Sequence, residues 1–189
     1  MLRISLFLLF LFASFLYSFT GVGEGASAVS EVKHVAKPDL CAELFRDMQL
    51  EGKVNYTAFR QAVTGYYRIT QRKRDILTLI DFSKPSTEKR LYVFDMKEKK
   101  MLFSSVVAHG KNSGGVYATS FSNEYGSYKS SLGFYLTAST YQGKNGYSLI
   151  LDGLEKGIND RARERAIVVH GAAYANSSVC RGGRLGRSF

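Results

Sequence analysis

Residues 90–110, with the sequence RLYVFDMKEKKMLFSSVVAHG, decide the fold class of this chain. Two runs rich in β-branched, aromatic and other apolar residues flank the polar segment KEKK at residues 97–100. Strand-forming runs joined by a short polar turn are typical of a β-hairpin. We therefore predict two antiparallel strands here, the second of which ends near His109, in front of a Gly-rich loop.

The same alternating pattern continues on both sides of this hairpin. It predicts further strands in four segments, residues 75–82, 132–142, 147–154 and 166–171. The turn GKNG joins two of them, and residues 115–131 form a long polar loop rich in Gly, Ser and Tyr. Short strands with polar turns predict a mainly β fold, a β-sandwich or curled sheet, and argue against a parallel α/β fold.

Two helices are predicted before the first strand, in residues 39–50 and 55–70. Each begins at a residue that commonly caps helices, Asp39 and Asn55 respectively. Apolar side chains recur on one face of each helix: Leu40, Leu44 and Met48, then Phe59, Val63, Tyr66 and Tyr67. We place a linker and this small helical hairpin in residues 29–70, and the β domain in residues 71–189.

The first 28 residues are predicted to be a secretory signal peptide. Arg3 precedes an apolar run at residues 4–19, and a Gly-rich stretch leads to the small residues at 26–28. The alternative is an uncleaved membrane anchor, but the run is shorter than the roughly 20 residues that span a bilayer. We therefore expect export to the periplasm or cell envelope, with no stable membrane span after cleavage.

The chain is strongly basic, with a formal net charge of +10 that removal of residues 1–28 leaves unchanged. Such an exported protein should be attracted to anionic polymers of a wall or membrane surface, and the alternative is a basic surface without a partner. No nucleic-acid-binding motif is present, so no nucleic acid is expected. Cys41 and Cys180 could pair in an oxidising compartment, and the sequence leaves this open.

Two histidines end predicted strands and are candidates for chemistry. His170 ends AIVVH and precedes Gly171; a strand end holds a base rigidly, and glycine lets a substrate approach the backbone. His109 precedes a Gly-rich loop whose backbone N–H groups could hold an anion. For both, packing in the core is the alternative. Two histidines and scattered acids are not a metal-ligand pattern, so we expect no metal.

Two basic segments lie on either side of Cys180. RARER, residues 161–165, is predicted to be a solvated face with local ion pairs. GRLGRS, residues 183–188, could present guanidinium groups to carboxylates, or be a solvated loop.

From about Leu77 to Phe189 the sequence resembles the murein L,D-transpeptidase catalytic-domain family of bacterial envelopes. The stretches that carry the resemblance most strongly are LDGLEKGINDRARERAIVVHGA and GRLGRS, and AHGKNSG, ATSFSN and GSYKSSLGFY support it. The resemblance implies a β-rich domain with a cysteine nucleophile and a histidine base, and no metal or organic cofactor.

The site motif of the wider superfamily is a histidine, a spacer, Ser or Thr, one further residue and Gly-Cys. His170, Ser188 and Phe189 fill the first positions, so the Gly-Cys pair would follow Phe189. The chain is therefore expected to be C-terminally incomplete, and inactive without that pair. By the same resemblance, the Gly171 carbonyl would orient the imidazole of His170. Cys180 does not match the motif position and is not expected to replace the nucleophile.

The resemblance implies acyl transfer on peptidoglycan stem peptides by an exported, monomeric enzyme. Candidate substrate contacts are Arg187, Ser188, His109 and Tyr174. The alternative is a non-catalytic wall-binding protein or inactive remnant of the family. The sequence leaves open whether such an enzyme cross-links or trims stems, which amine accepts the acyl group, and whether the helical hairpin gates or only braces the site.

Overall fold

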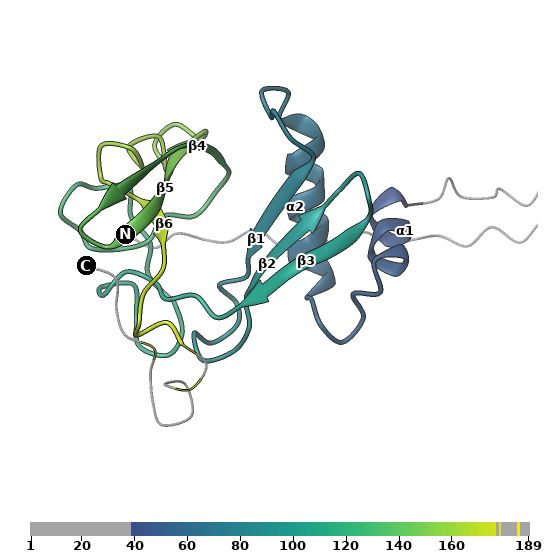
Figure 1. The fold of residues 1–189 in the computed structure, drawn as a ribbon, viewed down its shortest axis with the longest axis horizontal. Helices are drawn as coiled ribbons and strands as arrows, with labels where there is room; N and C mark the ends of the chain where they lie inside the picture. The colour runs from purple at the N-terminus through teal and green to yellow at the C-terminus, as the bar shows by residue number, and fades with distance from the viewer. Residues whose placement is uncertain (1–38, 177, 179–184, 186–189) are drawn as a thin grey trace, which may run out of the picture. The chain divides into compact units, whose positions relative to one another are not determined.

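Two helices precede six strands in the part of the chain that the computed structural model describes, residues 39–176, 178 and 185 (Figure 1). The predicted signal peptide, the predicted linker as far as residue 38, and Cys180, Arg187 and Ser188 lie outside these described residues. All described residues belong to one structural unit, Lys37–Phe189. Within them, neither helix combines the length and the apolar character that a membrane span requires.

Both predicted helix starts are confirmed. Helix α1, Leu40–Asp47, begins after Asp39, whose carboxylate accepts a hydrogen bond from the backbone N–H of Cys41 at 3.0 Å. Helix α2, Tyr56–Arg68, begins after Asn55, whose side-chain oxygen accepts from the N–H of Ala58 at 3.0 Å. These bonds satisfy N–H groups that the first turn of a helix leaves without intrahelical partners.

The predicted hairpin within residues 90–110 is also confirmed, but its second strand ends at Ser105, so the prediction that it ends near His109 is wrong. Strands β2, Leu91–Asp95, and β3, Lys100–Ser105, pair antiparallel across the polar turn, and β1, Ile76–Ile80, pairs antiparallel with the other edge of β2. The first sheet therefore has the order β1-β2-β3.

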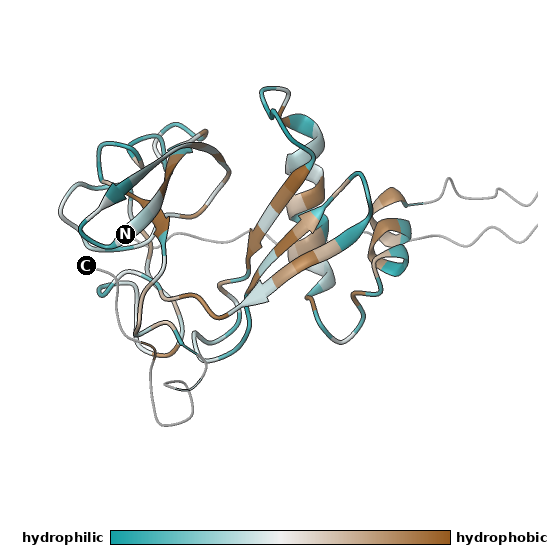
Figure 2. Ribbon diagram, viewed as in Figure 1, coloured by the Kyte–Doolittle hydropathy of each residue, from teal (hydrophilic) through white to brown (hydrophobic). Residues whose placement is uncertain are grey.

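The hydrophobic core lies between this sheet and the two helices. The ring of Phe59 on α2 packs edge-on against Phe94 of β2, with centroids 5.5 Å apart, and against Phe45 of α1 at 5.4 Å. Phe59, Val63 and Phe94 are fully buried. Figure 2 shows the hydrophobic residues along α2 and the strands beside it. Burying these aromatic side chains stabilises the packing of the hairpin of helices on the sheet.

Two of the residues predicted to share the apolar face of a helix are not buried. Leu40 is 49% exposed and Tyr67 is 47% exposed, whereas Leu44, Met48 and Tyr66 are buried as predicted. Leu40 is the first residue of α1 and lies before the turn that meets the core. Tyr67 follows Tyr66 directly, and consecutive helical residues point about 100° apart, so only one of them can face the sheet.

The remaining strands form a second antiparallel sheet with the order β4-β5-β6. Strand β4, Tyr135–Gly143, turns through the predicted GKNG segment into β5, Gly146–Gly153, and β5 pairs with the three-residue strand β6, Val168–His170. The predicted mainly β class with a small N-terminal helical hairpin is therefore confirmed, and the strands divide into two sheets of three. Residues 106–134 connect the sheets with only a single isolated bridge, between Gly114 and Ala118.

Candidate active site

Strand β6 places His170 at the edge of the second sheet. In the antiparallel register His170 lies opposite Ser148 of β5, and Val169 lies opposite Leu149. Ser148 is buried, with only 1% of its surface exposed, whereas His170 is half-buried. The histidine is therefore anchored through its backbone at a buried position of β5, while its ring keeps contact with solvent.

The ring of His170 is oriented by the residue that follows it. Nδ1 of His170 lies 2.8 Å from the backbone carbonyl oxygen of Gly171, the contact that the resemblance implied. A carbonyl oxygen can only accept a hydrogen bond, so Nδ1 carries the proton in this contact. In the neutral imidazole the other nitrogen, Nε2, then has a free lone pair, which is the arrangement a general base needs.

The turn between β5 and β6 is held by a buried asparagine. Asn159 is fully buried, and its side-chain NH₂ donates to the carbonyls of Leu132 and Phe134 at 3.1 and 2.9 Å. Its side-chain oxygen accepts from the N–H of Glu155 at 2.9 Å, and Glu155 in turn accepts from the N–H of Phe134 at 2.7 Å. These bonds connect the turn before β6 to the segment that enters β4.

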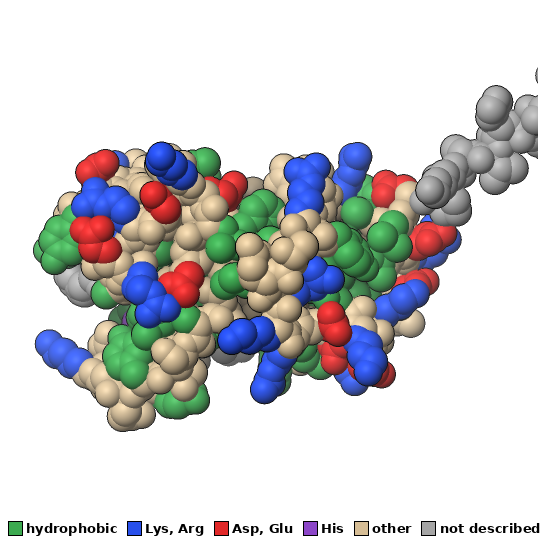
Figure 3. Space-filling view, turned by 90° about the horizontal axis from the view of Figure 1, so that it is seen from above, with side chains coloured by type: hydrophobic (Ala, Val, Ile, Leu, Met, Phe, Trp, Pro, Cys, Tyr) green, Lys and Arg blue, Asp and Glu red, His purple; other side chains and the backbone are tan. Residues whose placement is uncertain are grey.

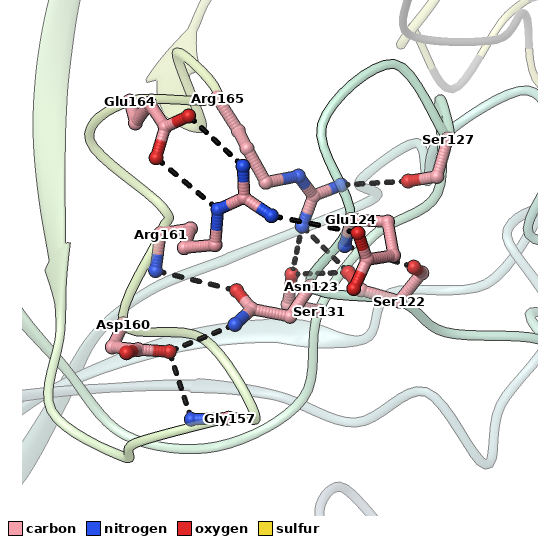
Figure 4. Close-up of polar contacts among 10 residues, drawn as sticks. All are labelled: Ser122, Asn123, Glu124, Ser127, Ser131, Gly157, Asp160, Arg161, Glu164 and Arg165. Atoms are coloured by element: carbon pink, nitrogen blue, oxygen red, sulfur yellow. Dashed lines mark hydrogen bonds and ion pairs between the residues drawn. The ribbon is translucent and has the colours of Figure 1, made fainter.

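Arg165 joins the same turn to the long loop at residues 122–131, as Figure 4 shows for its serine contacts. Its guanidinium donates to the carbonyls of Ser122 and Lys129 at 2.5 and 2.6 Å. It also donates to the hydroxyls of Ser131 and Ser127 at 2.5 and 3.1 Å. Burial lowers the pKa of Arg165 from its ordinary value, but arginine remains charged at neutral pH.

The other arginines of RARER confirm the prediction of a solvated face with local ion pairs. Arg161 pairs with Glu164 at 3.0 Å and with Glu124 at 3.4 Å, and Arg163 pairs with Asp152 at 2.6 Å. The hydrogen bond from Arg163 lowers the pKa of the Asp152 carboxyl. For Arg165 the same prediction is wrong, because this side chain turns inward and binds the loop.

His109 lies in a buried polar cluster. The His109 ring is 5% exposed, and its Nδ1 lies 2.9 Å from the guanidinium Nη2 of Arg90, itself fully buried. Since guanidinium can only donate, Nδ1 is the acceptor and the proton is on Nε2, which lies 3.4 Å from the carbonyl oxygen of Gly114. The predicted substrate contact of His109 stays a prediction beside the packing alternative.

Arg90 makes the buried cluster possible. It donates to the carbonyls of Lys84 and Val107 at 2.9 and 2.8 Å, and its guanidinium lies 5.0 Å from the ring centroid of Phe82. Burial lowers the pKa of Arg90 to about 10, so it remains charged at neutral pH. No sequence pattern indicated that this arginine, directly before β2, would be buried.

The segment after Gly171 forms one wall of a cavity. Ala175 N–H donates to the carbonyl of Ala172 at 2.9 Å and closes a turn that contains Tyr174, which is half-buried. The cavity, of about 320 Å³, is lined by residues of this segment together with the end of β3. Tyr174 is not one of the lining residues. Its predicted role as a substrate contact stays a prediction.

Neither a metal cluster nor a disulfide is found within the described residues. No group of three or more His, Cys, Asp or Glu side chains there could hold a metal ion. Cys41 is a free thiol on α1, and burial raises its pKa, as does the nearby Asp39 carboxylate. A thiol in this state is less reactive than an ordinary cysteine.

The comparison with known families identifies this arrangement. The family model described as the L,D-transpeptidase catalytic domain matches residues 50–189, most of the chain. The chain belongs to the L,D-transpeptidase catalytic domain family. The match begins before Leu77, so this catalytic domain includes α2 as well as both sheets. No curated protein and no solved structure gives a significant match.

Proposed function

We propose that this domain transfers acyl groups between peptidoglycan stem peptides in the cell envelope, with His170 as the general base for a cysteine thiol. Membership of the L,D-transpeptidase catalytic domain family supports the reaction class. The observation that carries the role of His170 is its 2.8 Å contact with the Gly171 carbonyl, because this contact leaves Nε2 unprotonated in the neutral ring.

In the proposed reaction, Nε2 of His170 takes the proton of the thiol, and the thiolate attacks the carbonyl carbon between the third and fourth residues of a stem. The carbon–nitrogen bond then breaks, and the imidazolium returns the proton to the amine of the departing D-alanine. The product is a thioester. The amine of a second stem then forms the cross-link, or water releases a trimmed stem. Base catalysis of this kind is worth roughly 10²–10⁴ in rate.

The charge of the chain supports an anionic partner. The formal net charge is +10, and Figure 3 shows Lys and Arg side chains spread along the face that it draws. A cationic surface raises the local concentration of a carboxylate-rich polymer. We propose export through residues 1–28, which N-terminal sequencing of the cellular protein tests: the first residue should be Val29.

The test of the base uses two proteins, the 189-residue chain and the same chain continued by Gly-Cys, each incubated with tetrapeptide stems. We expect D-alanine release only from the second chain. A Gly-Ser continuation is the matched control, because it removes only the sulfur. In the Gly-Cys chain, His170→Gln should reduce release by at least about 10²-fold.

Two outcomes would contradict the proposal. The first is release by the Gly-Cys chain that His170→Gln leaves unchanged, since the histidine would then not be the base. The second is release by the 189-residue chain that Cys180→Ala abolishes, since Cys180 would then be the nucleophile. Stem binding without release by any chain would favour the alternative of a wall-binding protein.

A further inference from the structure

The cavity beside the segment that follows His170 has one cationic wall and one small-residue wall. Its volume is about 320 Å³, and its lining residues are Lys89, Ser104, Ser105, Val106, Ala172, Ala175 and Asn176. Lys89 and the end of β3 belong to the first sheet and its approach, whereas residues 172–176 follow directly from β6. The cavity therefore lies where the candidate base leaves the second sheet.

The chemistry of the lining favours an anionic group. Among the described lining residues Lys89 is the charged one, and none of them is Asp or Glu, although Glu88 is the neighbour of Lys89 in the chain. Among the described residues no salt bridge of Lys89 is found, and its side chain is exposed. Its backbone carbonyl accepts from the Tyr92 hydroxyl at 2.7 Å, which fixes the position from which the side chain extends.

The neighbouring groups suit a carboxylate in particular. Ser104 and Ser105 are consecutive on β3, so their side chains point to opposite faces, and one of the two hydroxyls can donate to a carboxylate oxygen beside the ammonium group. Ala172 and Ala175 leave room, because neither side chain extends beyond a methyl group. The cavity thus combines a point charge, a hydroxyl donor and space for a small group.

The chain connection to His170 limits how far the cavity can lie from one carboxylate of the proposed substrate. Ala172 is two residues after His170, and two residues of chain span at most about 7 Å. In a stem that ends in D-alanine, the terminal carboxylate is one residue beyond the carbonyl that is attacked, or at most about 4 Å further along. A stem whose attacked carbonyl lies beside the imidazole can therefore extend this carboxylate toward Ala172 and the cavity.

We propose that this cavity binds the terminal carboxylate of the donor stem and that Lys89 is its charged contact, a specificity-determining residue that selects stems with a free D-alanine carboxylate. This inference rests on the proposed function, because it takes the stem peptide as the substrate. A second cavity, of about 340 Å³, is also cationic, but its described lining residues do not include residues 170–176; they are Thr70, Arg72, Lys73, Arg74 and Asp75.

The test is a binding experiment with the 189-residue chain, so it does not depend on the nucleophile. NMR titrations follow the His170 ring signals with two ligands, a tetrapeptide stem ending in D-alanine and the same peptide as its C-terminal amide. For the parent chain we expect the acid to bind roughly fivefold or more tightly than the amide. Lys89→Met should bind acid and amide alike.

Lys100→Met is the matched control. It also removes one lysine charge, but Lys100 starts β3 and is about 17 Å along the strand from Ser105. It should keep the preference for the acid. The subsite is wrong if Lys89→Met also keeps that preference while the peptides still shift the His170 signals. If neither peptide shifts those signals in the parent chain, the proposed function fails and the subsite fails with it.

Discussion

Replacing Arg165 by methionine should destabilise the catalytic domain much more than the same change at its neighbour Arg163. Methionine keeps the unbranched apolar part of the side chain and removes every donor. At Arg165 this breaks four hydrogen bonds, to two backbone carbonyls and two serine hydroxyls of residues 122–131. At Arg163 it breaks only a solvent-exposed pair with Asp152.

The number of hydrogen bonds lost at Arg165 sets the expected fall in the free energy of unfolding. A hydrogen bond contributes a net ~1 kcal/mol, and more where the donor is charged, but Arg165 is half-buried and water can replace part of what is lost. We therefore expect the free energy of unfolding to fall by about 2–4 kcal/mol, and Tm by roughly 6–12 °C for a domain of this size. Arg163→Met should cause no resolvable change, because exposed ion pairs contribute little.

Urea denaturation followed by circular dichroism measures both variants. Arg165→Lys is a third variant to measure. One ammonium group cannot reach all four acceptors, so lysine should restore less than half of the free energy of unfolding that Arg165→Met loses. The reasoning is refuted if Arg163→Met and Arg165→Met lower the midpoint equally, because the effect would then come from charge removal alone. It is also refuted if Arg165→Lys restores full stability.

Three further changes test other contacts. Gly65→Ala should destabilise the domain by about 1–3 kcal/mol despite the better helix propensity of alanine, because the new Cβ would collide with the Phe134 ring. In a Phe134→Ala background the same change should stabilise the domain. Thermal unfolding of the parent, the two single variants and the double variant tests both expectations. Asn159→Asp should lower the free energy of unfolding, measured by urea denaturation, by about 3 kcal/mol or more, because a buried carboxylate would face two carbonyl oxygens. Asp160→Asn, at an exposed position, is the comparison. The hydrogen bond from Tyr56 lowers the pKa of the Asp39 carboxyl, so the ionised carboxylate adds stability at neutral pH that is lost as pH falls through that lowered pKa. Asp39→Ala should therefore lower Tm more at pH 7 than at acidic pH below that pKa, where a neutral carboxyl can still cap the helix, and an equal loss at both would contradict this.

The parts of the fold that could be predicted are those determined by local chemistry. The polar turn at residues 97–100 sets the β2–β3 hairpin, and Asp39 and Asn55 set the helix starts through bonds to residues two or three positions away. Helical periodicity identified the buried face of α2 but not its edge, so Tyr67 was grouped with the buried Tyr66 although it is exposed. Division of the strands into two sheets depends on pairings between distant segments, which a single sequence does not specify.

The candidate site shows the same limit. The contact of His170 with Gly171 joins adjacent residues, so a short sequence motif can specify it. Arg165, in contrast, binds partners between 34 and 43 positions away, and nothing in RARER distinguishes it from the two other arginines beside it. His109 was found at a predicted strand end, but its burial depends on Arg90, 19 residues earlier in the chain.

These distant contacts determine how firmly the candidate base is held. Strand β6 has three residues and pairs only with β5, so its own hydrogen bonds hold it weakly. The turn before it is closed by a bond from Ile167 N–H to the Ala162 carbonyl at 2.9 Å, and it forces Ala166 to a φ of 55°, a conformation that alanine adopts only at a cost. Since Arg165 fixes this turn to residues 122–131, Arg165→Met should shift or broaden the NMR signals of the His170 ring although it touches neither His170 nor Gly171. Arg163→Met should leave those signals in place, and equal changes in both variants would show that the turn, and not the Arg165 contacts, positions the histidine.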